Sequence, residues 1–338
     1  MKKRRITVLL AACFMVLLFA GQGMAKPEVE LALGHVWQEG SGQALALDKF
    51  AEMVDKNSEG RIQVNVFHAA QLGNNRAEVE AVSMGTQDMM MESLVFFAPY
   101  SKALRITEVP FVWKSPEHIV KWVQSNSFKK AHEEVIKNGK QRFINMHVLW
   151  RRGPFRWMLS TKPIMEIKDV KGLKMRLWQE KTIHAAWRGY GAATVGMPWG
   201  DVYLGLRQGT IDAVTGPWDL LWATKFTEVA KYVTVLKQFW QVGCLSINEK
   251  KWQSLSKEFQ GILTKSADGA GIYYNKLTED LVEPTRVNIL DKHKAVIIEI
   301  SRLPFIEKMH KEILPKMEQD GLFPAGLVKE VMALTPQD

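Results

Sequence analysis

The sequence has few cysteines: only Cys13 and Cys244 occur in 338 residues. Cys13 lies in the apolar N-terminal segment, so a mature chain without that segment has one thiol and no internal disulfide. A chain of this length can bury a sufficient core without disulfides. We expect Cys244, within VGCLSI, to be a buried structural thiol.

Recognisable catalytic and metal-binding motifs are also lacking. The eight histidines are scattered, and no H-E-x-x-H pair, P-loop or G-x-S-x-G elbow occurs. Gly189-Tyr190-Gly191 lacks the third glycine of a dinucleotide fingerprint. We therefore expect no catalytic residue, no metal and no cofactor, and a binding protein in place of an enzyme.

Long apolar runs are confined to the first 25 residues. A basic stretch, residues 2–5, precedes the apolar residues 6–20, and small residues at 23–25 resemble a cleavage site. This pattern predicts a signal peptide (residues 1–25) that is cleaved, which places the mature protein in the periplasm. A membrane anchor, or lipidation at Cys13 after Leu10-Ala11-Ala12, is the alternative.

Much of the positive charge belongs to that leader. The formal charge is +9, and loss of the four cations at residues 2–5 leaves +5. Nucleic acid is therefore not an expected partner, whereas a small anion is compatible with the remaining charge. Apolar residues make up 46% and charged residues 24% of the chain, a composition typical of a folded protein.

Alternation of strands and helices begins after residue 28. Apolar residues at every second position predict strands at 29–33 and 62–66, and a further strand is expected at 89–91. Helical spacing predicts a helix from 41–42 to 57–60 and a short helix that includes 79–82. Such alternation favours an α/β unit with a mostly parallel sheet.

A second α/β unit follows from about residue 150. The expected elements are strands at 155–159, 173–177, 192–196 and 211–216, and helices near 181–189 and 200–208. Residues 238–248 resemble a strand that returns to the first unit, and residues 251–282 are predominantly helical. The crossings predict a two-lobed, periplasmic-binding-protein-like fold with a ligand cleft and a long helix among the crossing segments. We assign residues 26–150 and about 238–280 to lobe I, and residues 151–237 and about 281–338 to lobe II.

Two arginines are candidates for the cleft. Arg176 lies within the apolar strand of DVKGLKMRLWQ (residues 169–179), and Arg156 lies on a neighbouring strand segment. The planar guanidinium donates two parallel hydrogen bonds to a carboxylate, so both residues could bind an organic acid. A salt bridge to a local Asp or Glu is the structural alternative for each.

Four segments resemble the solute-binding proteins of tripartite ATP-independent periplasmic (TRAP) transporters, the DctP type. They are LALGHVWQEGSGQALALDKFAEMVDKNSEGRIQVNVFHAAQLG, KPIMEIKDVKGLKMRLWQ, MPWGDVYLGLRQGTIDAVTGP and FTEVAKYVT. The resemblance implies that Arg176 pairs with a ligand carboxylate and that Arg156, in GPFR, is a second ligand arginine. It also implies membrane permease subunits as partners, and we expect a monomer.

Sialic-acid-type members of the family have polar side chains at three pocket positions where this sequence has Val36, Val95 and Gly216. At a further position, which is aromatic in those members, this sequence has Trp199. The resemblance implies a pocket lined by His35, Val36, Trp37, Glu92, Phe155, Arg156, Arg176, Trp178, Trp199, Gly216 and Trp218. Loss of polar groups disfavours hydroxyl-rich ligands, because each unsatisfied buried polar group costs about 1–3 kcal/mol.

We therefore expect an aromatic or indole-type acid, an aromatic keto acid or an aromatic amino acid, whose ring would gain from stacking on indoles. An amino acid would be favoured if Glu92 faces its ammonium group. Ectoine-like cations, short aliphatic keto acids and sugar acids are alternative ligands. A periplasmic enzyme and a sensory binding protein are alternatives of another class.

Overall fold

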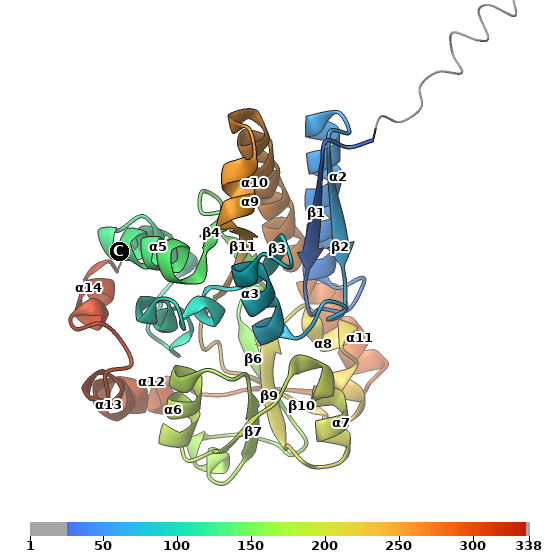
Figure 1. Ribbon diagram of the computed structural model, residues 1–338. Coiled ribbons are helices and arrows are strands. Elements are labelled where there is room, and N and C mark those ends of the chain that lie inside the picture. The colour runs from blue at the N-terminus through green and yellow to red at the C-terminus, as the bar shows by residue number, and fades with distance from the viewer. Residues whose placement is uncertain (1–25, 336–338) are drawn as a thin grey trace, which may run out of the picture.

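A computed structural model describes residues 26–335, so the leader predicted at residues 1–25 lies outside the described residues. Two six-stranded sheets form two halves of the molecule (Figure 1). The first sheet contains β1 (Val29–Gly34), β2 (Ile62–Phe67), β3 (Met89–Ser93), β4 (Gln141–Phe143), β5 (Trp150–Arg152) and β11 (Gln241–Asn248). The second contains β6 (Arg156–Ser160), β7 (Lys174–Leu177), β8 (Ala193–Gly196), β9 (Ala213–Pro217), β10 (Tyr232–Val235) and β12 (Val296–Glu299).

This arrangement confirms the predicted two-lobed α/β fold, but both sheets are mixed. The pairs β1–β2, β1–β3, β7–β8, β7–β9 and β10–β12 are parallel. In contrast, β11 runs antiparallel to β3, β4 and β5, and β6 runs antiparallel to β9 and β10. Strands β6 and β11 each follow a crossing from the other half, so they enter their sheets in the opposite direction. The expectation of a mostly parallel sheet in the first unit is wrong, because two of its strand pairs are parallel and three are antiparallel.

Helices cover both sheets and join the two halves (Figure 1). The first half carries α2 (Gly42–Ser58), α3 (Asn75–Met84), η1 (Leu94–Phe97), η2 (Lys102–Glu108), α4 (Pro116–Val123), α5 (Asn126–Gly139), α9 (Glu249–Ser254) and α10 (Lys257–Asp280). The second carries η3 (Ile167–Val170), α6 (Lys181–Gly189), η4 (Trp199–Asp201), α7 (Val202–Arg207), α8 (Leu220–Ala223), η5 (Phe226–Glu228), α11 (Val282–Asp291), α12 (Leu303–Lys308), the π-helical η6 (Met309–Ile313) and α13 (Leu314–Gln319). The long helix α10 packs on α2 and β5.

The C-terminal segment serves both halves. Strand β12 pairs with β10 in the second sheet, and η6 and α13 contact α6. The last helix, α14 (Leu327–Ala333), returns to the first half, where His118 Nε2 of α4 donates to the Val331 carbonyl oxygen at 2.7 Å. The segment after residue 281, assigned from the sequence to lobe II as a whole, is therefore divided between the two sides.

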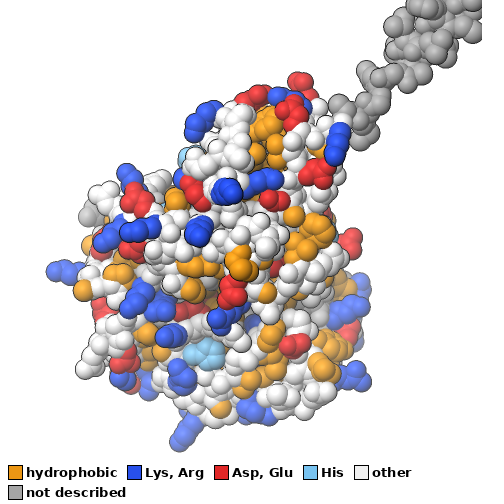
Figure 2. Space-filling model, viewed as in Figure 1, with side chains coloured by type: hydrophobic (Ala, Val, Ile, Leu, Met, Phe, Trp, Pro, Cys, Tyr) orange, Lys and Arg blue, Asp and Glu red, His pale blue; other side chains and the backbone are white. Residues whose placement is uncertain are grey.

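Local sequence signals explain several element boundaries. The Ser41 side chain accepts a hydrogen bond from the Ala44 amide and begins α2, and Glu59 ends it in a left-handed conformation followed by Gly60. Cys244 is fully buried, as predicted. Within residues 26–335 no helix is both long and apolar enough to span a bilayer. Figure 2 shows Lys and Arg side chains distributed among Asp and Glu side chains over the visible face.

Candidate functional site

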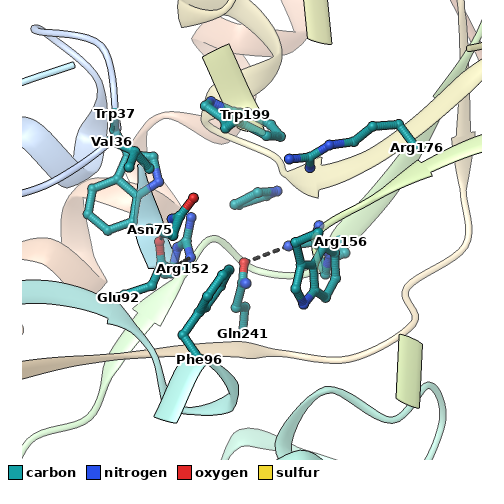
Figure 3. A pocket seen from close by; sticks show the side chains of 12 residues that line it. Val36, Trp37, Asn75, Glu92, Phe96, Arg152, Arg156, Arg176, Trp199 and Gln241 are labelled. Atoms are coloured by element: carbon teal, nitrogen blue, oxygen red, sulfur yellow. Dashed lines mark hydrogen bonds and ion pairs between the residues drawn. The ribbon is translucent and has the colours of Figure 1, made fainter. Parts of the chain in front are cut away.

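A cavity lies where the ends of strands from both sheets meet (Figure 3). Its lining contains three arginines, four aromatic rings and three further polar side chains. These residues and their apolar neighbours are Val36, Trp37, Asn75, Glu92, Phe96, Arg152, Arg156, Arg176, Trp178, Trp199, Pro217 and Gln241. The cavity therefore combines concentrated positive charge with flat apolar walls, a composition suited to an organic anion.

Arg176 is the cation with the fewest protein partners in this cavity. Its Nε donates to the Met197 carbonyl oxygen at 2.8 Å, and its guanidinium lies 5.2 Å from the Trp199 ring centroid. Within residues 26–335, its two terminal nitrogens donate no hydrogen bond and no carboxylate lies within ion-pair distance. Burial and the nearby Arg156 lower its pKa to about 9, so the side chain stays charged at neutral pH.

Arg156 is held more firmly. One terminal nitrogen, Nη1, donates to Gln241 Oε1 at 2.5 Å, and Nη2 donates to the Thr215 carbonyl and hydroxyl oxygens at 2.7 and 3.1 Å. The guanidinium also lies 4.9 Å from the Trp178 ring centroid. Burial lowers its pKa to about 9, although Glu108 opposes the shift. These contacts fix the position of the charge that a ligand would meet.

Arg152 is a third arginine of the cavity, and it forms a buried ion pair with Glu92. Its Nη1 donates to Glu92 Oε1 at 2.8 Å and to Ser93 Oγ at 2.7 Å, and the guanidinium lies 4.6 Å from the Trp37 ring centroid. Glu92 also accepts hydrogen bonds from the Asn75 amide group and the Ser93 backbone amide. The Glu92 carboxylate thus already has protein partners, which argues against its use for a ligand ammonium group.

Two indole rings of the lining have buried N–H groups without a partner in the described chain. Trp178 Nε1 and Trp199 Nε1 are buried and have no hydrogen-bond partner among the described residues. A buried N–H group without a partner costs free energy. Both indole rings contribute flat apolar surface to the lining.

The cavity is compact in this conformation. Its volume is about 40 Å³, measured as the room for the centre of a water-sized sphere. One water needs roughly 10–15 Å³ by that measure, so the space suits a few waters or a carboxylate-sized group. A second hollow shares Asn75, Phe96, Arg176 and Trp178 with it and extends towards Met197 and Pro198. A ligand larger than a short acid would extend into this hollow or require the two halves to separate.

Comparison with known proteins identifies the family. Residues 33–320 match DctP, the bacterial extracellular solute-binding proteins of family 7. The chain belongs to this family. It is 28% identical over 331 residues to the 2,3-diketo-L-gulonate-binding periplasmic protein of Escherichia coli (strain K12), covering 98% of this chain and 99% of that protein. It is 25% identical to the C4-dicarboxylate-binding periplasmic protein of Rhodobacter capsulatus, over 82% of each chain.

A solved structure shares the two-lobed fold of this DctP-family protein. It is the TRAP periplasmic solute-binding protein of Roseobacter denitrificans with bound L-galactonate, with a TM-score of 0.83 and 24% identity. The match covers 92% of this chain and 100% of that chain. The family model and the shared fold together describe the chain as a bacterial extracellular solute-binding protein of family 7 with two lobes.

The structure places two of the expected aromatic residues behind the cavity. Trp218 Nε1 donates to the Val282 carbonyl oxygen at 2.9 Å, which turns this indole towards α11. Phe155 packs on Trp218 at a centroid distance of 5.7 Å, with Lys237 on its ring. Neither side chain belongs to the lining, because their contacts are with the base of the second sheet and with α11.

Gly216 and His35 also lie outside the lining, and both lie next to indole rings that belong to it. A Cβ at Gly216 would lie 3.0 Å from Trp157 Cζ2 and 3.4 Å from Trp199 Cη2, so this glycine provides space for both rings. His35 stacks on Trp37 at 5.4 Å, accepts from the Trp37 amide through Nδ1, and contacts His68. Burial lowers the pKa of His35 to about 3, which makes it a neutral support for Trp37.

Five lining residues were missed by the sequence reasoning: Asn75, Phe96, Arg152, Pro217 and Gln241. Arg152 could have been predicted from the sequence, because adjacent side chains of a strand point to opposite faces of the sheet. Arg151 points outward to Glu279, and Arg152 consequently points into the cavity. Gln241 could also have been predicted, because it is the first residue of β11, the strand that returns to the first half. Within the described residues no cluster of His, Cys, Asp and Glu has the composition of a metal site.

Proposed function

We propose that this protein captures a small organic carboxylate in the periplasm and delivers it unchanged to the membrane subunits of a TRAP permease. The observation that carries the proposal is Arg176, whose terminal nitrogens face the cavity (Figure 3) and have no protein carboxylate to neutralise them. A ligand carboxylate would accept two parallel hydrogen bonds there, beside the fixed charge of Arg156. Closure of the lobes would then remove water from the ion pair and strengthen it.

A hydroxyl-bearing or keto acid is the ligand class that the polar lining favours. The side-chain amides of Asn75 and Gln241 line the cavity and can exchange hydrogen bonds with oxygens along a short carbon chain. The named relatives bind 2,3-diketo-L-gulonate, L-galactonate and C4-dicarboxylates. Nothing in these comparisons supports the aromatic acid expected from the sequence.

An aromatic acid is retained as the second candidate because four rings line the cavity. Trp37, Phe96, Trp178 and Trp199 could enclose an indole or phenyl group, with stacking worth about 0.5–1.5 kcal/mol per pair. The compact cavity counts against this candidate, since a bicyclic ring requires more space than the present conformation provides.

A thermal-shift screen tests the proposal and separates the two classes. The panel contains L-galactonate, 2,3-diketo-L-gulonate, succinate, indole-3-acetate, phenylpyruvate, tryptophan and ectoine. We expect the largest rise in Tm with a hydroxyl- or keto-acid, following RT ln(1 + [L]/Kd), and recovery of that acid chemically unchanged. A response only to aromatic acids would make an aromatic acid the first candidate ligand. Chemical conversion of the bound acid would indicate an enzyme in place of a transport protein. No response to any carboxylate would contradict the proposal.

A further inference from the structure

A buried acid stands behind the cavity, one hydrogen bond removed from Arg156. Glu108, the last residue of η2, is 1% exposed, and Gln241 Nε2 donates to its Oε1 at 2.6 Å. The Oε1 atom of the same Gln241 accepts from Arg156 Nη1 at 2.5 Å. One amide therefore connects the acid to a cavity arginine. The second carboxyl oxygen of Glu108 has no hydrogen-bond partner among the described residues, so its ionised form is poorly stabilised.

The charges around the cavity are nearly balanced before any ligand enters. Three buried arginines line it, and Glu92 and Glu108 face them from the first half. A third buried acid, Asp219, interacts with Arg152 from the other side. Three cations thus meet three acids in a region of low dielectric. A carboxylate ligand adds one negative charge, and uptake of one proton by an acid of this group restores the balance.

Glu108 is the acid best placed to accept that proton. Burial raises its pKa to about 7, opposed by Arg156, the Gln241 hydrogen bond and Arg152, and supported by Glu92. These residues are the charged and polar groups that face it from β3, β5, β6 and β11. A carboxylate bound near Arg156 would offset part of the field that keeps Glu108 ionised, so its pKa would rise further.

We propose that Glu108 takes up one proton from solvent when the protein binds an organic acid, so that anion and proton are captured together. The inference rests on the proposed function, because it assumes a carboxylate beside Arg156 and Arg176. The step is a protonation only: the carboxylate of Glu108 becomes a carboxylic acid, and the ligand stays an anion. Below about pH 6 Glu108 is protonated before binding and no proton is taken up. Above pH 7 binding draws a proton, so affinity falls as pH rises.

Calorimetry in buffers of different ionisation enthalpy measures this uptake directly. The probe is whichever acid of L-galactonate, 2,3-diketo-L-gulonate, succinate and indole-3-acetate raises Tm most. At pH 8 we expect uptake approaching one proton per acid, with Kd weakening by up to about tenfold per pH unit above that value. Glu108→Gln, whose side-chain oxygen can still accept from Gln241, should bind without proton uptake and with a pH-independent Kd.

Two matched variants assign the proton. Glu78→Gln removes a different buried acid, one bonded to Gln87 and not to Gln241, and should leave the uptake unchanged. Asp219→Asn should also retain it. Absence of uptake by the wild-type protein, its persistence in Glu108→Gln, or its loss in Asp219→Asn would each overturn the inference. Binding without uptake would leave the transport proposal intact, whereas failure of every acid to bind would overturn both.

Discussion

Arg176 differs from the other cavity arginines because its terminal nitrogens have no protein acceptor in the described chain. Arg152 is neutralised by Glu92, and Arg156 is bound by Gln241 and Thr215. A buried cation without a counter-ion is costly, and the cost is recovered when an anion binds. The presence of Arg176 at this buried position is thus explained better by ligand binding than by a contribution to the stability of the fold.

Substitutions of Arg176 should show how much of the ligand binding depends on its charge and how much on its planar geometry. Arg176→Ala removes both donors and should weaken binding of the best acid by at least about 2 kcal/mol, or roughly thirtyfold. Arg176→Lys keeps the charge but loses the planar fork, and should cost about 1 kcal/mol or more. Titration calorimetry measures both effects. Arg207→Ala, an exposed arginine of α7, is the control and should bind normally. Equal affinity of Arg176→Lys and the wild type would contradict two-point recognition.

Gly216 should limit the position of Trp199. A methyl group at this site would lie 3.0 Å from Trp157 Cζ2, which is too close, and in ordinary contact with Trp199 at 3.4 Å, so the Trp157 ring would have to shift within the space that it shares with Trp199. We expect Gly216→Ala to destabilise the protein by about 1–3 kcal/mol through overpacking and to weaken acid binding several-fold. Urea unfolding and calorimetry check the two effects. Unchanged affinity together with full stability would show that Trp199 does not depend on this space.

At the scale of elements, a partly buried ion pair joins the two halves. Arg105 of η2 lies 3.2 Å from Glu180, the N-cap residue of α6, and its Nη1 also donates to the Leu322 carbonyl oxygen at 3.2 Å. Both side chains are largely shielded from water, so removal of one partner would leave the other charge buried without compensation. The contact connects a 3-10 helix beside the cavity with the helix that follows the Arg176 strand.

Loss of this pair should affect stability more than loss of an exposed one. Arg105→Met leaves Glu180 without its cation and should lower the free energy of unfolding by about 2 kcal/mol. Arg286→Met, which breaks the exposed pair with Glu283, should cost less than about 1 kcal/mol. Urea unfolding of both variants provides the comparison. Equal effects would mean that the interlobe pair is no stronger than a surface pair.

Elements with clear periodicity could be predicted, whereas side-chain direction at the cleft could not. Strand β1, helix α2 and helix α6 lie where the apolar pattern and the caps indicate. Residues 94–97 and 102–108 form two short, mostly buried 3-10 helices without a repeating pattern, and this hid both Phe96 and Glu108. The sequence gives no means of telling Trp199, which faces the cavity, from Trp218, which bonds to α11, because that distinction depends on tertiary contacts.

At the scale of the whole molecule, buried ionisable groups set the pH dependence of stability. Burial raises the pKa of Glu78 to about 8, of Glu108 to about 7 and of Asp219 to about 6. An acid with a raised folded pKa binds more protons in the folded state, so stability falls as pH rises through this range. His35 and His132, whose pKa values burial lowers to about 3 and 4, act in the opposite direction only below about pH 6.5.

The ligand-free protein should therefore lose stability between pH 6.5 and 8. We expect Glu78→Gln to reduce this slope, because the folded state then gains no proton at that site. Urea unfolding at both pH values measures the change in free energy of unfolding. A wild-type protein that is more stable at pH 8 than at pH 6.5 would contradict the assignment of these acids as protonated in the fold.

The central claim is that the Arg176 guanidinium is completed by the carboxylate of a captured acid. A crystal structure of the protein with the acid that gives the largest thermal shift tests it most directly. We expect both terminal nitrogens of Arg176 within hydrogen-bond distance of the ligand carboxylate, with the Trp199 ring beside the ligand. A ligand bound with its carboxylate elsewhere, and Arg176 paired with a protein acid such as Asp201, would contradict the claim.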